Sequence, residues 1–318
     1  MSESALPHDP LWPRAGGWPA ASEWVGRSAA DAWADVGILG VPTHATSLSP
    51  TSADVTPAAV RAALRRYSPT LAMDRSVRHP IDPDELDLDR RSQLDFGDVH
   101  EPDGADGAAR VIAAVADALE HVRLLVALGG DNALTFPVAL GAWGAQLPTA
   151  GLITLDAHHD LRDGESNGSP VRQLLDAGFD GRRIVQVGIA DFANSRAYER
   201  RALDAGITII HRDELHRRPL HDVMAEALHI AGAGGGPIHV DLDLDVCDRS
   251  VVPACPASVP GGIAAWELRA AARLAASDPR VRSMDIAEVD AGADAPDGRT
   301  VRLAALCVLE ATAGFALR

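Results

Sequence analysis

The chain has 318 residues, of which 47% are hydrophobic and 23% are charged, which is enough apolar sequence to build a sizeable core. Its formal net charge of −16 argues against binding to nucleic acid or to an anionic membrane, because no basic run supplies a patch of opposite sign. Three cysteines, no signal-like N-terminal segment and no apolar run of about 18 residues predict a cytoplasmic protein without membrane spans.

The order of apolar runs along the chain predicts one domain with a parallel sheet. Residues 1–34 mix Pro, Gly, Trp and Ser without periodicity and are expected to form an N-terminal arm before a single catalytic domain, residues 35–318. Short runs rich in Val, Ile and Leu that mostly do not alternate then predict buried strands. These runs cover residues 35–42, 122–130, 150–158, 183–190, 207–211, 238–245 and 281–290.

Helical patterns lie between these strands. Thr56 followed by proline is a typical helix start, since proline at the first helical position has no N–H to leave unpaired. Further helices are expected over residues 107–121, 132–141, 169–177, 220–231, 264–275 and 301–313. Residues 70–105 are polar and rich in Pro and Asp, and are expected to be irregular. Alternating strands and helices predict an α/β fold, whose ligands collect at the carboxyl ends of the strands.

The first polar cluster follows the strand that ends near Leu155. Asp156, His158 and Asp160 alternate with Ala157 and His159, and alternate residues of an extended backbone share a face. Two carboxylates and an imidazole on one face are costly to bury unpaired, and a divalent cation would remove that cost. A solvated loop with ordinary ion pairs explains this cluster equally well when it is taken alone.

The second cluster lies on the predicted strand at residues 238–245. Asp241, Asp243 and Asp245 alternate onto one face of a strand otherwise made of Val and Leu. Carboxylates this close repel one another, and one stays protonated unless a cation neutralises them. This pattern favours a metal site over a purely structural role.

Two weaker signals complete the set. Gly129-Gly130-Asp131-Asn132 ends one strand, and Asn132 opens the next helix, so it could serve as an N-cap rather than a ligand. Glu288 lies at the end of a later strand.

The combined set of carboxylates with one imidazole suits a hard cation such as Mn²⁺ better than zinc. Two such ions a few ångströms apart are a known device for generating hydroxide at neutral pH.

The order GGDN, DAHHD, a DxDxxD motif at Asp243, Asp245 and Asp248, and a late glutamate resembles the ureohydrolase (arginase, agmatinase and formimidoylglutamase) family. The match covers nearly the whole chain from about Val36. This chain departs from the family pattern at Asp241, where the family has serine, and at Arg249, where it has proline. The resemblance implies a three-layer α/β/α sandwich with a mostly parallel, eight-stranded sheet.

The resemblance also implies a dinuclear manganese centre. Asp156 and Asp243 would bridge the metals, and His158 and Asp245 would complete one site. Asp160 would serve the other site and take part in catalysis, with Asn132 where the family usually has histidine. The metal beside Asn132 is expected to be held more weakly. Glu288 would face the cationic nitrogens of the substrate.

Two features point to the formimidoylglutamase branch. Arginases and agmatinases carry a proton-shuttling histidine at the position of Asn167, and the asparagine here is a candidate to bind the substrate. The loop after DAHHD resembles the formimidoylglutamase motif, and Arg162 and Arg172 are candidates to bind an acidic substrate because guanidinium groups match carboxylates.

These features predict hydrolysis of N-formimidoyl-L-glutamate to L-glutamate and formamide, a reaction of histidine catabolism. An agmatinase-like enzyme that releases urea is the alternative within enzymes, and a metal-poor protein that only binds a ligand is the alternative outside them. By analogy with the family, a homo-oligomer, either a trimer or a hexamer, is expected. The sequence leaves open whether Cys247 and Cys255 form a disulfide.

Overall fold

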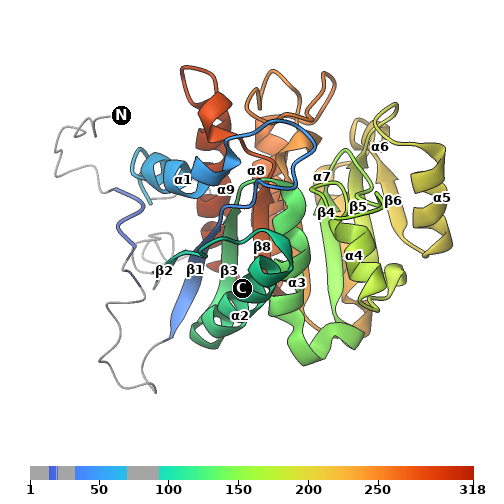
Figure 1. Ribbon diagram of the computed structural model, residues 1–318, viewed down its shortest axis with the longest axis horizontal. Coiled ribbons are helices and arrows are strands. Elements are labelled where there is room, and N and C mark those ends of the chain that lie inside the picture. Colours follow the sequence, from blue (N-terminus) through green and yellow to red (C-terminus); the bar gives the residue numbers. More distant parts are fainter. Residues whose placement is uncertain (1–13, 19, 21–32, 70–92) are drawn as a thin grey trace, which may run out of the picture.

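The computed structural model describes residues 14–18, 20, 33–69 and 93–318 (Figure 1). They form an eight-stranded sheet in the order β2-β1-β3-β8-β7-β4-β5-β6, and each neighbouring pair is parallel. The strands are β1 (Ala34–Val41), β2 (Gln93–Asp98), β3 (Val122–Gly129), β4 (Gly151–Leu155), β5 (Ile184–Ile189), β6 (Thr208–His211), β7 (Ile238–Asp243) and β8 (Val281–Ala287).

Helices cover both faces of this sheet. One layer contains α1 (Thr56–Leu64), α9 (Arg299–Phe315), α8 (Ala265–Ser277) and α7 (Leu220–Ala231), packed in that order. The other contains α2 (Gly104–His121), α3 (Thr135–Trp143) and α4 (Pro170–Asp176), while α5 (Arg196–Asp204) and α6 (Arg212–Leu215) lie near β6 (Figure 1). The predicted three-layer α/β/α sandwich is therefore confirmed.

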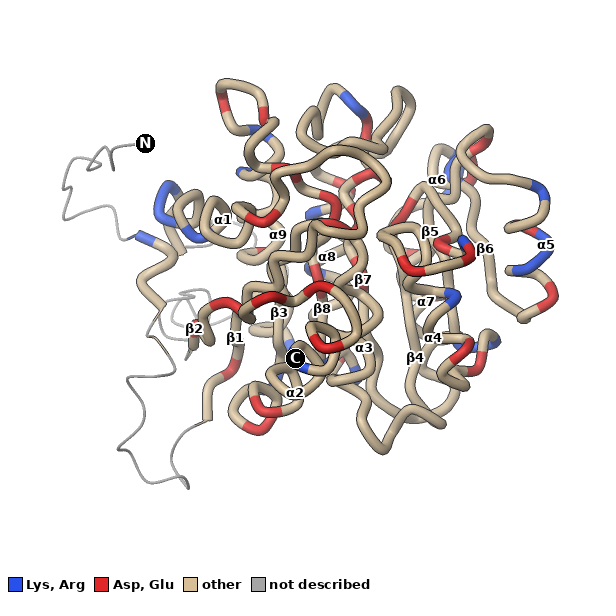
Figure 2. Tube along the Cα trace, viewed as in Figure 1, with Lys and Arg blue, Asp and Glu red and all other residues tan. Residues whose placement is uncertain are grey.

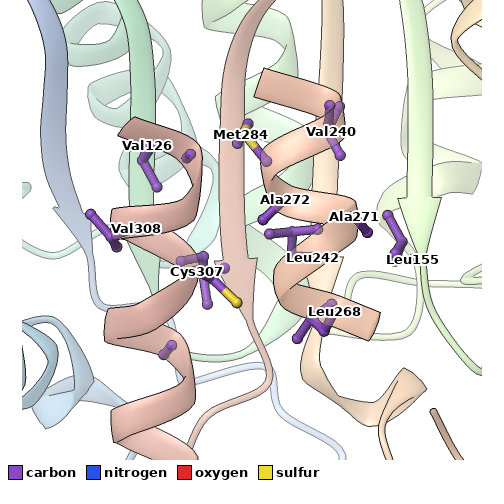
Figure 3. Packing of buried hydrophobic residues seen from close by; sticks show 14 of the residues in the cluster. Val126, Leu155, Val240, Leu242, Leu268, Ala271, Ala272, Met284, Cys307 and Val308 are labelled. Carbon is purple, nitrogen blue, oxygen red and sulfur yellow. The ribbon is translucent and has the colours of Figure 1, made fainter. Parts of the chain in front are cut away.

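Apolar side chains of the central strands pack against α8 and α9 (Figure 3). Val240 and Leu242 of β7 lie in this core with Leu268 of α8, and all three are buried. Each fully buried Val or Leu stabilises the fold by roughly 1.5–3 kcal/mol. Because neighbouring strand residues point to opposite faces, His239, Asp241 and Asp243 of the same strand point toward the α3 layer. The apolar packing on one face thus sets the direction of the polar side chains on the other.

Several predicted boundaries were wrong. The insertion expected to be irregular contains β2, an edge strand of the sheet that pairs with β1, forms an isolated bridge from Asp95 to Ala20, and contains exposed acidic residues. Arg61 of α1 supports this strand through an ion pair with Asp95 at 2.7 Å. Helix α2 begins at Gly104, three residues earlier than predicted, and the short helices α5 and α6 were not anticipated. These helices carry many charged residues, so their apolar pattern is weak.

Most of the predicted N-terminal arm lies outside the described residues, so the domain boundary at residue 35 stays a prediction. The greater part of the 70–105 insertion also lies outside the described residues. Within residues 14–18, 20, 33–69 and 93–318, each helix is too short or too polar to cross a bilayer.

Candidate active site

The loop after β4 begins the site at the carboxyl edge of the sheet, where Figure 2 shows acidic residues gathered in the upper loops. Asp156 is buried, and its Oδ1 accepts a hydrogen bond from the backbone N–H of His158 at 2.6 Å. Its other oxygen, Oδ2, is buried without a hydrogen-bond partner. Strand β4 ends at Leu155, so these residues meet through a tight loop and not through the extended alternation that we predicted.

Strand β7 brings its carboxylates to the same place. Asp243 is the last residue of β7, and its Oδ1 accepts the backbone N–H of Asp245 at 2.7 Å. Asp245 lies in a short 3-10 turn rather than on the strand, which corrects the predicted strand end. Its Oδ2 lies 2.6 Å from His158 Nδ1, and its Oδ1 accepts the backbone N–H of Ala157 at 2.8 Å. The turn thus points Asp245 at the β4 loop.

The charges in this cluster do not balance. Burial, and next the charge of Asp245, raises the pKa of Asp156 to about 7. The same two causes, in the same order, hold the pKa of Asp243 well above its usual range. Burial opposes ionisation of Asp245 too, but the charge of His158 together with the hydrogen bonds from His158 and the Ala157 N–H lowers the pKa of Asp245. One imidazole therefore compensates one carboxylate, and the remaining carboxyl groups call for a further positive charge.

Asp160 and Asn132 face each other across the site. Asn132 Nδ2 donates to Asp160 Oδ2 at 2.6 Å, and Asn132 Oδ1 accepts from the Thr135 hydroxyl at 2.6 Å. Asp131, not Asn132, is the N-cap of the following turn, because its side chain accepts the backbone N–H of Ala133. Asn132 is therefore free of the capping role and has its amide directed into the site. Asp160 has a φ of +54°, a conformation that non-glycine residues rarely adopt.

Glu288 is buried and directly follows β8. Its Oε1 accepts the backbone N–H of Asn132 at 2.9 Å and the Asn167 amide at 2.7 Å. Asn167 in turn accepts the backbone N–H of Leu48 at 3.0 Å, which joins the loop after β1 to the site. Burial raises the pKa of Glu288 to about 7, against the opposing effect of the Asn167 hydrogen bond. Glu288 also has a positive φ, +57°. Its carboxylate is thus rigidly held.

The two candidate substrate-binding arginines differ. Arg172 Nε donates to the Arg162 carbonyl at 2.7 Å, its Nη2 donates to the Gly164 carbonyl at 2.6 Å, and its Nη1 pairs with Asp176. Arg172 therefore braces the loop from within. Arg162 is exposed, and its guanidinium forms no hydrogen bond within the described residues. We accordingly favour Arg162 over Arg172 as the substrate ligand.

A second polar layer lies one residue pair deeper on β7 and β8. Asp241 is hydrogen-bonded to Asp285, its cross-strand neighbour. His239 lies 3.0 Å from Asp285 Oδ2 and 2.8 Å from the Ser283 hydroxyl. All four residues are almost fully buried, and burial and then the charge of Asp285 hold the pKa of Asp241 well above its usual range. The raised pKa favours the neutral form of Asp241, and Oδ1 of Asp241 and Oδ1 of Asp285 are buried without a hydrogen-bond partner.

Sequence reasoning missed a network that supports the β4 loop. His159 Nδ1 lies 2.7 Å from Gln186 Oε1, and the Gln186 amide donates to the His159 carbonyl at 3.0 Å. Asn194, from the loop after β5, accepts the His159 N–H at 3.0 Å and donates to the Ala157 carbonyl at 2.9 Å. Spacing along the chain contains no signal for these contacts, because they join residues 27 to 37 positions apart.

The three cysteines are free thiols. Cys247, Cys255 and Cys307 are buried, so the disulfide left open by the sequence is not formed here. Burial holds the pKa of Cys247 and Cys255 well above the usual range. They pack as small apolar side chains.

The donor set fits a hard divalent cation. Asp156, His158 and Asp245 each place one ligand atom within 4.8 Å of the others. Asp243 and Asp160 lie outside that group. Asp243 is joined to it through the N–H of Asp245, and the charge of Asp156 acts on Asp160. The unpartnered Asp156 Oδ2 and the excess of carboxyl groups are what a bound cation would satisfy.

Comparisons with known proteins agree with this arrangement. Residues 34–314 match the model of the arginase family. A formimidoylglutamase from Halalkalibacterium halodurans is 32% identical over 291 residues, 89% of this chain and 88% of the relative. One from Bacillus subtilis is 33% identical over 293 residues, 88% of this chain and 87% of the relative.

Solved structures share the fold. The crystal structure of Bacillus subtilis formimidoylglutamase superimposes with a TM-score of 0.86 at 28% identity and covers 100% of this chain and 96% of its own. Trypanosoma cruzi formiminoglutamase, solved with Mn²⁺, has a TM-score of 0.81 at 22% identity and covers 92% of this chain and 96% of its own. The family match, the full-length relatives and the shared sandwich lead to one conclusion: this chain belongs to the arginase family.

Proposed function

We propose that the protein is a manganese-dependent hydrolase that converts N-formimidoyl-L-glutamate and water to L-glutamate and formamide. The observation that carries this proposal is the similarity, over nearly the whole length of both chains, to two bacterial formimidoylglutamases. The reaction breaks a C–N bond that is not a peptide bond. A cytoplasmic location fits a reaction on a small soluble metabolite.

The proposed metal ligands are those of the acidic cluster. Asp156 and Asp243 would bridge two ions, His158 and Asp245 would complete one site, and Asp160 would serve the other beside Asn132. Two divalent ions held by these residues would lower the pKa of water and so supply a nucleophile at neutral pH.

The chain's own residues would bind the substrate and handle its protons. Glu288 is fixed by Asn132 and Asn167, so its carboxylate can accept N–H groups of the formimidoyl end. Arg162 would bind a carboxylate of the glutamate end. Asp160, whose pKa is raised by burial and then by Asp156, would hold the proton that leaves water and pass it to the departing amine. The new C–O bond and the broken C–N bond yield formamide and glutamate.

We also propose that the ion beside Asn132 is held more weakly than its partner. The Asn132 oxygen already accepts from Thr135 and its nitrogen donates to Asp160, so coordination of a metal by this neutral amide would compete with both hydrogen bonds. Loss of one ligand is expected to cost about 10–100-fold in affinity, the scale seen for disturbed metal shells. Added Mn²⁺ should therefore raise activity.

A substrate panel tests the proposed function. The Mn²⁺-loaded protein is assayed with N-formimidoyl-L-glutamate, agmatine, arginine and guanidinobutyrate, while formamide and urea are measured separately. We expect formamide release from the first compound at the highest kcat/KM. Faster release of urea from a guanidine compound would establish the agmatinase-like alternative, and no turnover despite bound metal would favour a binding protein. Light scattering of the same sample tests the expected trimer or hexamer.

A further inference from the structure

Two arginines brace the loop at residues 161–169 and leave a third unpaired. Arg201 of α5 donates through Nη1 to the Leu161 carbonyl at 2.6 Å and to Asp163 at 2.9 Å. Arg172 holds the same loop from the α4 side. Within the described residues, these interactions leave the guanidinium of Arg162 without a hydrogen-bonded or ionic partner. The chain has a net charge of −16, so an unpaired arginine beside the site gives a local positive charge in a protein that is negative overall.

The stem of Arg162 is held close to the site. A Cβ at Gly168 would lie 2.7 Å from Arg162 Cδ, so the arginine chain passes directly over this glycine. The neighbouring residue, Asn167, is hydrogen-bonded to Glu288 at 2.7 Å. A side chain at position 168 would therefore displace Arg162 from its place beside Asn167, the residue that binds Glu288.

The guanidinium end of Arg162 meets an aromatic ring. Arg162 Cζ lies 6.0 Å from the centroid of the Tyr198 ring, and Arg201 Cζ lies 5.9 Å from the same centroid. A guanidinium near the face of a ring is attracted by the ring quadrupole and can stack on it. Tyr198 thus connects the loop-bracing Arg201 to the unpaired Arg162.

We propose that Tyr198 is a positioning residue that determines specificity for acidic substrates by holding Arg162 ready for a substrate carboxylate. This inference rests on the proposed function, because it needs a substrate with a carboxylate at the end away from the formimidoyl group. A free arginine side chain loses rotamer entropy when it binds, and a ring that already restrains it reduces that cost. Tyr198 therefore acts on substrate binding and leaves the chemical step unchanged.

Steady-state kinetics of the Mn²⁺-loaded protein with N-formimidoyl-L-glutamate test the proposal. Tyr198→Leu should raise KM about 2–5-fold with kcat unchanged, whereas Tyr198→Phe, which keeps the ring, should stay close to the native KM. Arg162→Met should raise KM by roughly 10–100-fold, and adding Tyr198→Leu to it should change nothing further. Arg200→Met, on the same helix, is the control for loss of one positive charge and should leave KM unchanged.

Two results would overturn the inference. One is an equal rise in KM from Tyr198→Leu with and without Arg162, and the other is an equal effect of Tyr198→Phe and Tyr198→Leu. If Tyr198→Leu does not fold, Arg162→Lys decides, since it keeps the charge but lacks the planar group. A native KM for Arg162→Lys would contradict the proposal, and a raised one would support it. A native protein that binds Mn²⁺ but does not hydrolyse N-formimidoyl-L-glutamate refutes the proposed function instead.

Discussion

Strand β7 places buried acidic side chains in two layers on one face: an upper layer around Asp243 at the end of the strand, and a lower layer around Asp241. The two layers differ in how the charge of their carboxyl groups is compensated. In the upper layer, Asp243 meets Asp156 and Asp245 at the carboxyl edge, and Asp156 keeps an unpartnered oxygen. In the lower layer, Asp241 interacts with Asp285, whose Oδ2 lies 3.0 Å from His239, and Oδ1 of each of these two carboxyl groups is also buried without a partner. We therefore propose different roles for side chains two positions apart on one strand: the upper carboxylates would bind a cation, whereas the raised pKa of Asp241 favours its neutral form beside Asp285 and His239.

The largest expected effect breaks the upper layer. Asp243→Ala should weaken Mn²⁺ binding by more than about 100-fold and abolish turnover, because it removes a proposed bridging ligand. Asp241→Asn, one residue pair deeper on the same face, is the matched control and should retain the metal. Elemental analysis of both dialysed variants measures the difference. Equal metal content in the two would remove the distinction between the layers.

Breaking the lower layer should affect folding rather than metal binding. Asp285→Ala leaves His239 and Asp241 buried without their partner, so the free energy of unfolding should fall by about 3–5 kcal/mol. Asp241→Asn imitates the neutral acid and should change it by less than about 1 kcal/mol. Urea denaturation of the metal-free proteins measures both values. If the two substitutions cost the same, Asp285 is not the centre of the network.

A third substitution tests whether the two proposed Mn²⁺ sites of the upper layer differ in affinity. Asn132→His should tighten the weaker Mn²⁺ site by about 10–100-fold, since it replaces an engaged amide with an imidazole. Thr135→Val, which frees the amide oxygen without adding a nitrogen ligand, is the control and should have a smaller effect. Calorimetric titration of the apo-protein with Mn²⁺ separates the two sites. Two equally tight sites in the native chain contradict the expectation.

The smallest expected effect compares the buried layers with Asp180, a half-buried carboxylate near the surface. Hydrogen bonds from Arg182 lower the pKa of Asp180 to about 2 from its usual 3.8. A lowered pKa stabilises the folded state at pH values above 3.8, and this contribution is lost as the pH falls through about 2. Solvent screening limits it, so Asp180→Asn should cost only a few tenths of a kcal/mol at pH 7. Thermal melts between pH 7 and pH 3 should show the difference shrinking; a constant difference would refute this origin.

The sequence was sufficient to predict the central strands of the sheet, because buried parallel strands are continuous apolar runs. It was insufficient for β2, whose acidic residues reflect an exposed edge, and for α5, whose sequence RAYERRALD is dominated by charge. Both elements are held by tertiary contacts that local patterns do not encode.

The sequence indicated which residues to consider for the candidate site, but not how their side chains are arranged in space. Strict alternation suggested that Asp241, Asp243 and Asp245 act together, whereas Asp241 belongs to the lower layer and Asp245 lies in a turn. Arg172 looked like a substrate ligand, yet its donors bond to its own loop and to Asp176. Such outcomes depend on cross-strand neighbours and loop conformation, which residue spacing does not determine.

Anomalous diffraction from crystals grown with Mn²⁺ is the most direct test of the division between the two layers. We predict anomalous peaks beside Asp156, His158, Asp243 and Asp245, with a weaker peak toward Asp160 and Asn132, and no peak between Asp241 and Asp285. A peak in the lower layer, or none beside Asp156 and Asp245, would contradict the assignment of the metal centre.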